Sequence, residues 1–312
     1  MAPIAGGGAK CASGGKRQMK PIVLALSLLA SAVASAVAAH ARPPRPDHIV
    51  IVIEENKSYS DIIGSKNAPY LNALARSGAL LTNFTAAHHP SQPNYVDFFA
   101  GSPLGVCDDT CVRTAFTAPN LGAALLATPG CSFVGFAEEL PRKPVCDLNG
   151  FAKRHCPWMD FSNVPASATE DLSKFPKDFR KLPAVSIVIP NLTNDMHDGK
   201  LVPAEVKAGD RWMRAKLGSY ARWAQTHNSL LIITWDEDSN EKYKIQCPAS
   251  LIVTTPPANR IPTIIAGQHV KRGSRSDAAY SHHDLLRTIL DMYGIAPFAG
   301  AASANDITGI WQ

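Results

Sequence analysis

The sequence predicts an α/β protein with one mostly parallel central sheet and helices on both faces of that sheet. Runs of mainly branched apolar residues, typical of strands buried on both sides, occur at 48–53, 184–189, 229–234 and 261–266. Segments with helical spacing of apolar residues lie between some of these runs, and such alternation indicates parallel strands joined by helices. The chain contains no G-x-G-x-x-G or P-loop motif and no internal repeat.

The first elements alternate between strand and helix. The run 48–53 (HIVIVI) is expected to be a strand, and 68–77 (APYLNALARS) a helix that stops at Gly78, because glycine is favoured just after a helix end. Residues 79–85 are expected to return as a short strand, and 95–100 to form a helix.

The middle of the chain, about 102–180, is rich in Cys, Pro and Gly and is expected to hold only short elements. In chain order, the remaining expected elements are strands at 132–137 and 184–189, a helix from Pro203 to about Thr226, strands at 229–234 and 261–266, and a helix from Ser281 to Tyr293. Both helices show apolar positions at helical spacing.

An apolar segment near the N-terminus indicates export. Residues 19–41 have a basic start, an apolar run from Ile22 to Leu29 and small residues at the end, which is the layout of a signal peptide. The run is too short for a good membrane span, so no stable membrane anchor is expected. Cleavage is expected after Ala41, with Ala38 as the alternative. The protein is therefore predicted to be secreted or periplasmic.

Residues 1–18 have no periodicity, and we interpret them as a mis-called extension before a true start at Met19. A retained N-terminal anchor is the alternative. Residues 42–312 then form a single domain that is long enough to bury a large α/β core. The net charge of +5 falls to +1 when the leader's four Lys and Arg are removed, so the charge gives no reason to expect nucleic-acid binding.

The cysteines agree with export. The six that follow the leader are Cys107, Cys111, Cys131, Cys146, Cys156 and Cys247. An even number in an exported protein predicts disulfides. Cys107 and Cys111 are close enough in sequence for a local pair, and the other pairings stay open. A zinc ribbon is the alternative, but the close cysteine pairs that it requires are missing.

Polar residues follow three of the expected strands. Glu54-Glu55-Asn56 follow the first strand, Ser91 follows the strand at 79–85, and Asp236-Glu237-Asp238 follow the strand at 229–234. In open α/β sheets the site lies at the carboxyl ends of the strands. Because adjacent carboxylates repel one another, their gathering there predicts a bound divalent cation. Solvated loop charges are the alternative for any one cluster alone.

Ser91 then has a chemical role. No G-x-S-x-G elbow surrounds it, which argues against an α/β-hydrolase, and a serine hydroxyl needs a base or a metal to become a nucleophile. A helix that begins just after Ser91 would direct backbone N–H groups at a phosphate. These features favour phosphoryl transfer over acyl transfer. His197 and the pair His282-His283 are the histidines placed to contribute.

Five stretches resemble one known family. They are VIEENKSYSDII, HPSQPNYVDFFAG, IPNLTNDMHDG, ITWDEDS and SHHDLLRTIL, and they span residues 50–290. Together they are similar to the phosphoesterase family of secreted acid phosphatases and phospholipases C, within the alkaline phosphatase superfamily. The resemblance implies an alkaline-phosphatase-like fold and a metal-dependent hydrolase of phosphate esters.

The resemblance also implies roles for individual residues. By position, the metal ligands are Glu55, Asn56, Ser91, Asp236 and Glu237. Asn56 is also implied to contact the phosphate, and Ser91 to form a phosphoserine intermediate. His197 and His282 are implied at the phosphate or at a second metal, and either could protonate the leaving alcohol. His89 matches a frequent family residue and is expected near the substrate. Which of His282 and His283 faces the site stays open.

One metal site is expected, with a second as the alternative, because Asp236-Glu237 stands where many two-metal members have Asp-His. The ion is left open among Ca, Mg, Mn and Zn, since the ligands include both oxygen and nitrogen donors. The expected substrate is a small phosphate monoester. The alternatives are a phosphodiesterase or phospholipase C on the same site, and a non-catalytic metal- or phosphate-binding protein. The oligomeric state is not predicted.

Overall fold

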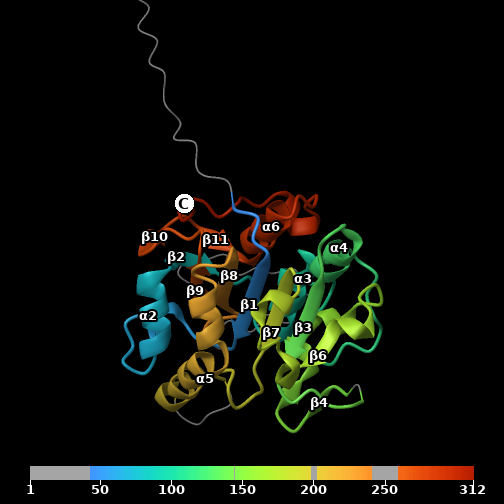
Figure 1. Cartoon of the computed structure of the whole chain (residues 1–312). Helices are drawn as coiled ribbons and strands as arrows, with labels where there is room; N and C mark the ends of the chain where they lie inside the picture. The colour runs from blue at the N-terminus through green and yellow to red at the C-terminus, as the bar shows by residue number, and fades with distance from the viewer. Residues whose placement is uncertain (1–42, 144, 198–201, 241–258) are drawn as a thin grey trace, which may run out of the picture. The chain divides into compact units, whose positions relative to one another are not determined.

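The computed structural model describes residues 43–143, 145–197, 202–240 and 259–312 (Figure 1). The expected extension 1–18, the signal peptide 19–41 and Cys247 lie outside these residues. No helix formed by the described residues is both long and apolar enough to cross a lipid bilayer.

A central sheet of nine strands is found within the described ranges. The strand order is β10-β2-β9-β8-β1-β7-β3-β6, and β11 also pairs with β2. The strands are β1 (His48–Glu54), β2 (Ala79–Thr85), β3 (Phe133–Ala137), β6 (Thr169–Asp171), β7 (Val185–Ile189), β8 (Ser229–Trp235), β9 (Arg260–Gly267), β10 (Ser274–Ser276) and β11 (Tyr280–Ser281). A separate hairpin joins β4 (Asp147–Leu148) to β5 (Phe151–Ala152).

The expectation of a mostly parallel sheet is confirmed. Strand β1 pairs in parallel with β7 and β8, and β3 pairs in parallel with β7 and β6. Strand β9 runs antiparallel to both of its neighbours, β2 and β8. The central strands are buried along almost their whole length, as their continuous apolar runs predict.

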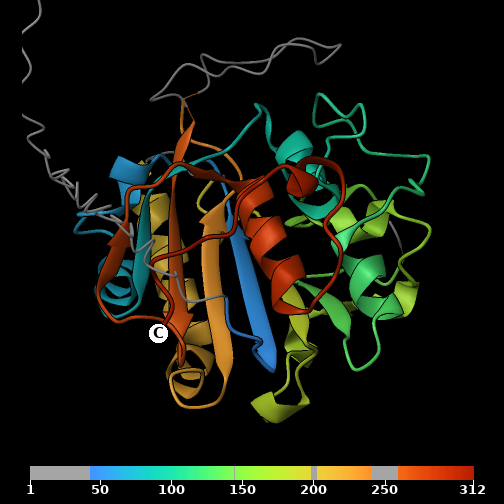
Figure 2. The same cartoon turned by 90° about the horizontal axis from the view of Figure 1, so that it is seen from above.

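Helices cover both faces of the sheet. The α-helices are α1 (Tyr59–Ile62), α2 (Pro69–Ser77), α3 (Ser91–Ala100), α4 (Leu121–Ala127), α5 (Val202–Trp223) and α6 (His282–Met292). Short 3₁₀ turns lie at Lys153–His155, Pro157–Asp160, Ala166–Ala168, Leu172–Lys174, Phe179–Lys181 and Ala299–Ala302. Helices α2 and α5 lie together on one face, and α3 and α6 pack together on the other (Figure 2). The expected helices are all found, and α1 and α4 are helices that the sequence did not predict.

Helix α3 begins at Ser91, four residues before its expected start at Tyr95. Pro93 lies in its first turn, where the missing N–H costs nothing because the first N–H groups of a helix have no partner within the helix. The helix ends at Gly101, whose φ of 68° is left-handed, a conformation that glycine adopts without strain. Ser91 is therefore a helical residue with a fixed backbone.

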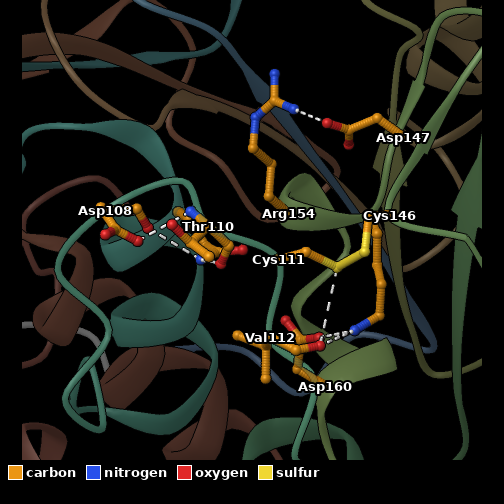
Figure 3. Close-up of a disulfide and its surroundings, with 10 residues drawn as sticks. Asp108, Thr110, Cys111, Val112, Cys146, Asp147, Arg154 and Asp160 are labelled. Carbon is orange, nitrogen blue, oxygen red and sulfur yellow. Dashed lines mark hydrogen bonds and ion pairs between the residues drawn. A yellow bond between two sulfur atoms is a disulfide. The ribbon is translucent and has the colours of Figure 1, made fainter.

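A disulfide among the described residues differs from the expected local pair. Cys111 bonds to Cys146 (Figure 3), so the local pairing of Cys107 with Cys111 is wrong. A contact between residues distant in sequence lies beside this bridge: Lys153, which follows β5, donates to the carbonyl of Val112 at 3.0 Å and also pairs with Asp160. A bridge across 35 residues contributes about 3–4 kcal/mol in the chain-entropy estimate.

The expectation of disulfides is confirmed, although two of the described cysteines form none. Cys131 and Cys156 are free thiols. Cys156 is fully buried, and burial raises its pKa well above the ordinary thiol value. It therefore stays protonated and behaves as a small apolar core residue.

We predict that Gly135→Ala strongly destabilises the fold. A Cβ at this position of β3 would lie 2.0 Å from Cε2 of Trp158, a buried side chain that cannot move away easily. Overpacking of this kind costs about 3 kcal/mol or more. Urea unfolding of wild type and Gly135→Ala measures the loss of unfolding free energy. Gly218→Ala in α5 is the control, since its Cβ would meet no atom closer than 3.5 Å, and equal midpoints for Gly135→Ala and wild type would contradict the prediction.

Candidate active site

The register of two neighbouring parallel strands brings the first acidic residues together. Glu54 at the end of β1 lies opposite Trp235 at the end of β8. The backbone N–H of Asp236 donates to the carbonyl of Glu54, which continues the ladder by one residue. Glu55 and Asp236 therefore leave the sheet side by side, at the carboxyl ends of adjacent strands.

Asn56 links the ends of β1 and β8 through hydrogen bonds. Its backbone N–H donates to Oδ1 of Asp236 at 2.9 Å, and its side-chain amide donates to Oε1 of Glu237 at 3.1 Å. Its φ of 44° is left-handed, a conformation that asparagine tolerates better than most residues. The turn after β1 thus depends on Asn56 in two ways: its backbone adopts a left-handed conformation, and its side chain forms a hydrogen bond.

Ser91 brings a hydroxyl to the same point from the start of α3. Its Oγ lies 2.9 Å from Oε2 of Glu55, 3.2 Å from Oδ1 of Asn56 and 3.5 Å from Oε1 of Glu237. The side chain is buried. Five residues that the sequence selected from three separate segments, Glu55, Asn56, Ser91, Asp236 and Glu237, therefore meet in the structure.

Burial places the three carboxylates in an unfavourable environment. Burial, followed by the charge of Asp236, raises the pKa of Glu55 well above its ordinary value. Burial and the charge of Glu237 do the same to Asp236. Burial also raises the pKa of Glu237, although its contact with His89 opposes this. Three adjacent buried carboxylates cannot all be charged unless positive charge is brought to them.

His89 supplies one positive charge. Its Nδ1 lies 2.9 Å from Oε2 of Glu237, and its Nε2 lies 3.3 Å from Oδ1 of Asp238. Burial lowers the pKa of His89, but the hydrogen bonds to Asp238 and Glu237 outweigh it and raise the value to about 9. This imidazole is therefore positively charged at neutral pH.

The other two candidate histidines lie at the margin of this cluster. The backbone N–H of His197 donates to Oδ1 of Asp195. His282 is buried against Phe84 and Phe98, and a ring nitrogen lies 2.9 Å from the carbonyl of Trp235. Burial lowers the pKa of His282 to about 4, so its ring is neutral at pH 7 and supports the segment that carries Asp236.

The structure also separates His282 from His283, which the sequence left open. His282 is 3% exposed and points inward. His283 is about one third exposed, and its Nε2 lies 2.8 Å from Oδ1 of Asp97. His282 is therefore the inward member of the pair.

Three further residues surround Glu55 that sequence reasoning missed as site residues. The hydroxyl of Tyr95 donates to Oε1 of Glu55, and Nε2 of His155 lies 3.2 Å from the same oxygen. The two rings stack at 5.0 Å, and Asp195 lies beyond them, 3.9 Å from Nδ1 of His155. Tyr95 follows Ser91 by four residues on one helix, and this spacing could have identified it. His155 comes from the irregular middle segment, where no pattern marks it.

The donor set suits a hard cation, although the side chains do not enclose one as they lie. Among the described residues, no group of three or more His, Cys, Asp and Glu side chains is arranged to hold a metal ion. The carboxylates instead hydrogen-bond to Ser91, Asn56 and Tyr95. Oδ2 of Asp236 is buried without a hydrogen-bond partner among the described residues, and an oxygen in that position is a ready ligand for Mg²⁺, Mn²⁺ or Ca²⁺.

The first turn of α3 offers fewer phosphate donors than the sequence suggested. The N–H of Gln92 already donates to Oδ1 of Asp109 at 2.9 Å, and Pro93 has no N–H. A phosphate next to Ser91 would therefore depend less on the helix start and more on the charged groups of the site.

A buried hydroxyl lies among carboxylates at the carboxyl edge of a mostly parallel sheet, and the fold is alkaline-phosphatase-like. The chain belongs to the Phosphoesterase family, which matches residues 65–296. The expected fold and family are thus confirmed, and the protein is a phosphatase, a phosphoric monoester hydrolase.

The relatives and a solved structure agree with this assignment. The chain is 42% identical to phosphatidylinositol-3-phosphatase of Mycobacterium tuberculosis, over 93% of this chain and 92% of that protein. It is 25% identical to an acid phosphatase of Aspergillus fumigatus over 77% of this chain, and spans 53% of the fungal protein. An alkaline phosphatase superfamily protein from Vibrio parahaemolyticus shares the fold, with a TM-score of 0.54, 14% identity and coverage of 85% and 70%.

We predict that Asp97 stabilises the protein in a pH-dependent way. Burial raises the pKa of Asp97, but hydrogen bonds with His283 and His88 outweigh it and lower the value to about 2. A carboxylate whose folded pKa is below its ordinary value contributes stability above pH 4, and this contribution fades as the pH falls from about 4 to 2. The full contribution is roughly 2 kcal/mol.

Urea unfolding of wild type and Asp97→Asn between pH 6 and pH 3 tests this. The gap in unfolding free energy should narrow by about 1 kcal/mol over that range. A gap that stays constant with pH would show that Asp97 acts through packing alone.

Proposed function

We propose that the protein hydrolyses phosphate monoesters through a phosphoserine intermediate on Ser91, with the help of a divalent cation. The observation that carries the proposal is the position of the Ser91 hydroxyl, within 3.5 Å of Glu55, Asn56 and Glu237. A serine used only to shape a turn would not require buried acidic residues on two sides of its hydroxyl.

The cation would be held by Glu55, Asn56, Ser91, Asp236 and Glu237. The raised pKa values of the three carboxylates and the orphaned oxygen of Asp236 support this placement. When bound, a divalent ion offsets negative charge and lowers the pKa of a coordinated hydroxyl. Oxygen ligands favour Mg, Mn or Ca, with Zn as the alternative. We favour one site, and a second would have to draw on Asp195 and His197.

The side chains of the site can carry out the proton transfers themselves. The Ser91 hydroxyl donates to Oε2 of Glu55, which is placed to accept the proton as Oγ attacks phosphorus and the bond from phosphorus to the leaving alcohol breaks. Water then cleaves the phosphoserine, which releases phosphate and restores the Ser91 hydroxyl. The hydroxyl of Tyr95 donates to the other oxygen of the Glu55 carboxylate, and Nε2 of His155 lies 3.2 Å from it, so neighbouring side chains orient the carboxylate before substrate arrives. Asn56 is positioned to contact the phosphate as well as the acidic residues.

Of the candidate histidines, His89 best fits the donor of a proton to the leaving alcohol. It is positively charged at neutral pH and adjoins Glu237. His282 is neutral there, which suits a supporting role better than that of an acid. The direct substrate contacts of His197 and His282 that the family resemblance implies stay predictions.

The bacterial relative supports a proposal for the substrate class. Because that protein is a phosphatidylinositol-3-phosphatase and matches nearly the whole chain, we propose that this protein removes a phosphate from an inositol lipid headgroup, and that small soluble monoesters are also substrates. The Cys111–Cys146 disulfide supports function outside the cytosol, as the signal-peptide interpretation of residues 19–41 requires.

We predict that Ser91→Ala abolishes turnover while the protein stays folded. Loss of a covalent nucleophile lowers kcat by about 10³-fold or more. Hydrolysis of p-nitrophenyl phosphate, with circular dichroism as the check on folding, measures this. Ser77→Ala, whose hydroxyl contacts the carbonyl of Leu74 in α2, should keep full activity. A Ser91→Ala protein with wild-type turnover would exclude Ser91 as the nucleophile.

We also predict that a chelator removes activity and that one added divalent ion restores it. The measurement compares p-nitrophenyl phosphate with bis(p-nitrophenyl) phosphate before and after chelation, with single ions added back. Asp236→Asn should require about tenfold more of the restoring ion, since it removes one charge from the ligand set. Turnover that survives exhaustive chelation would refute the cation, and a preference for the diester would favour the phospholipase C alternative.

A further inference from the structure

Outside the candidate active site, residues of α2 and α5 line a cavity. These two helices lie on the face of the sheet opposite α3 and α6 (Figure 2). The cavity has a volume of about 690 Å³, and we call it the arginine groove after the residues that give it its charge. These are Arg211, Arg214 and Arg222 on α5 and Arg272 beside β10. Tyr70 on α2 and Asp210 on α5 also line the groove, and a hydrogen bond between them links the two helices. None of them belongs to the candidate active site.

The four arginines of the arginine groove are exposed to solvent. None of them forms an ion pair with another described residue. Arg222 makes one hydrogen bond, to Oγ of Ser219 at 3.1 Å. Four like charges around one cavity repel each other, and an anion between them relieves that repulsion.

Asp210 is the one acidic residue among the described residues that line the groove, and both oxygens of its carboxylate already accept hydrogen bonds. Its two oxygens accept the backbone N–H groups of Tyr70 at 3.2 Å and Leu71 at 2.8 Å. This fixes the start of α2 against α5 and turns the carboxylate toward the backbone. The groove therefore keeps an excess of positive charge.

Gly218 leaves space in the groove at a helical position where an alanine would favour the helix. A Cβ on Gly218 would lie 3.5 Å from the hydroxyl of Tyr70 and 3.7 Å from Nη1 of Arg222. The phenol hydroxyl and one guanidinium thus lie within van der Waals contact of the same point on α5. Arg222 and Arg214 both oppose the rise that burial causes in the pKa of Tyr70, which agrees with their positions around that hydroxyl.

We propose that the arginine groove binds a compact organic anion with two or more phosphate groups. Guanidinium groups bind phosphate oxygens through paired N–H donors, and the phenol of Tyr70 adds another hydrogen-bond donor. The cavity volume lies within the usual range for small-molecule sites. Two phosphates match the four guanidiniums better than one. The inference does not depend on the proposed function of Ser91, because the groove uses separate residues on a separate face.

The test measures binding of inositol hexasulfate, a compact polyanion that a phosphatase does not hydrolyse, by isothermal titration calorimetry. The groove variant is Arg214→Gln/Arg222→Gln, and the control with the same charge change is Arg113→Gln/Arg180→Gln, at two exposed arginines elsewhere. We expect the groove variant to bind about tenfold more weakly or worse, and the control to bind like wild type. Both should hydrolyse p-nitrophenyl phosphate at the wild-type rate.

A second variant tests the site without changing charge. Gly218→Leu fills the space beside Tyr70 and should also weaken binding at least about tenfold, whereas Gly218→Ala should not. No binding by wild type, equal binding by the groove variant and its control, or unchanged binding by Gly218→Leu would each overturn the proposal.

A lipid arm identifies the source of the anion. Flotation with phosphatidylcholine vesicles, with and without phosphatidylinositol 4,5-bisphosphate, is compared for wild type and the groove variant. Vesicle binding that requires the phosphorylated lipid and is lost in the groove variant assigns the groove to a lipid headgroup. Calorimetric binding without vesicle binding assigns it to a free soluble anion.

Discussion

The site depends on one constraint: the parallel register of β1 and β8 forces Glu55 and Asp236 to emerge side by side in a buried place. Their mutual repulsion and their desolvation must be offset, and the surrounding residues are arranged to do this. Ser91 donates to Glu55, Asn56 donates to Asp236, and the hydroxyl of Tyr95 donates to the remaining oxygen of Glu55. The Ser91 hydroxyl, which is proposed to react, is thus held by one of the hydrogen bonds that stabilise Glu55 and Asp236 in their buried position.

The sequence predicted the fold where the signal was local. Continuous apolar runs identified β1, β7, β8 and β9, because a strand buried on both faces needs such a run whatever its neighbours are. It could not predict that β9 runs antiparallel to both of its neighbours, since direction depends on how the chain crosses the sheet. The Cys111–Cys146 bridge was missed for a similar reason: packing of the irregular middle segment sets it.

For the candidate site, too, the sequence predicted the residues with a local signal and missed those placed by tertiary packing. Glu55, Asn56, Asp236 and Glu237 could be selected from sequence because each directly follows a buried strand, and strand ends meet at one edge. His155 could not, because it reaches Glu55 from a 3₁₀ turn whose position depends on tertiary packing. Its environment also differs from that of a solvated histidine: burial keeps its pKa far below the ordinary value, so it meets the carboxylate as a neutral partner.

The charge of the substrate completes the argument for a cation. A phosphate monoester has the same sign as the three carboxylates it must approach, so the cluster repels it unless positive charge intervenes. His89 carries one positive charge but shares it with Glu237 and Asp238. Lys57, the next basic residue along the chain from Asn56, is buried in a pair with Glu205 at 3.1 Å. The described residues near Ser91 therefore stabilise their own acidic groups and leave little positive charge for a phosphate. A bound divalent ion would meet both needs at once, which is why we place substrate binding and nucleophile activation at the same oxygen ligands.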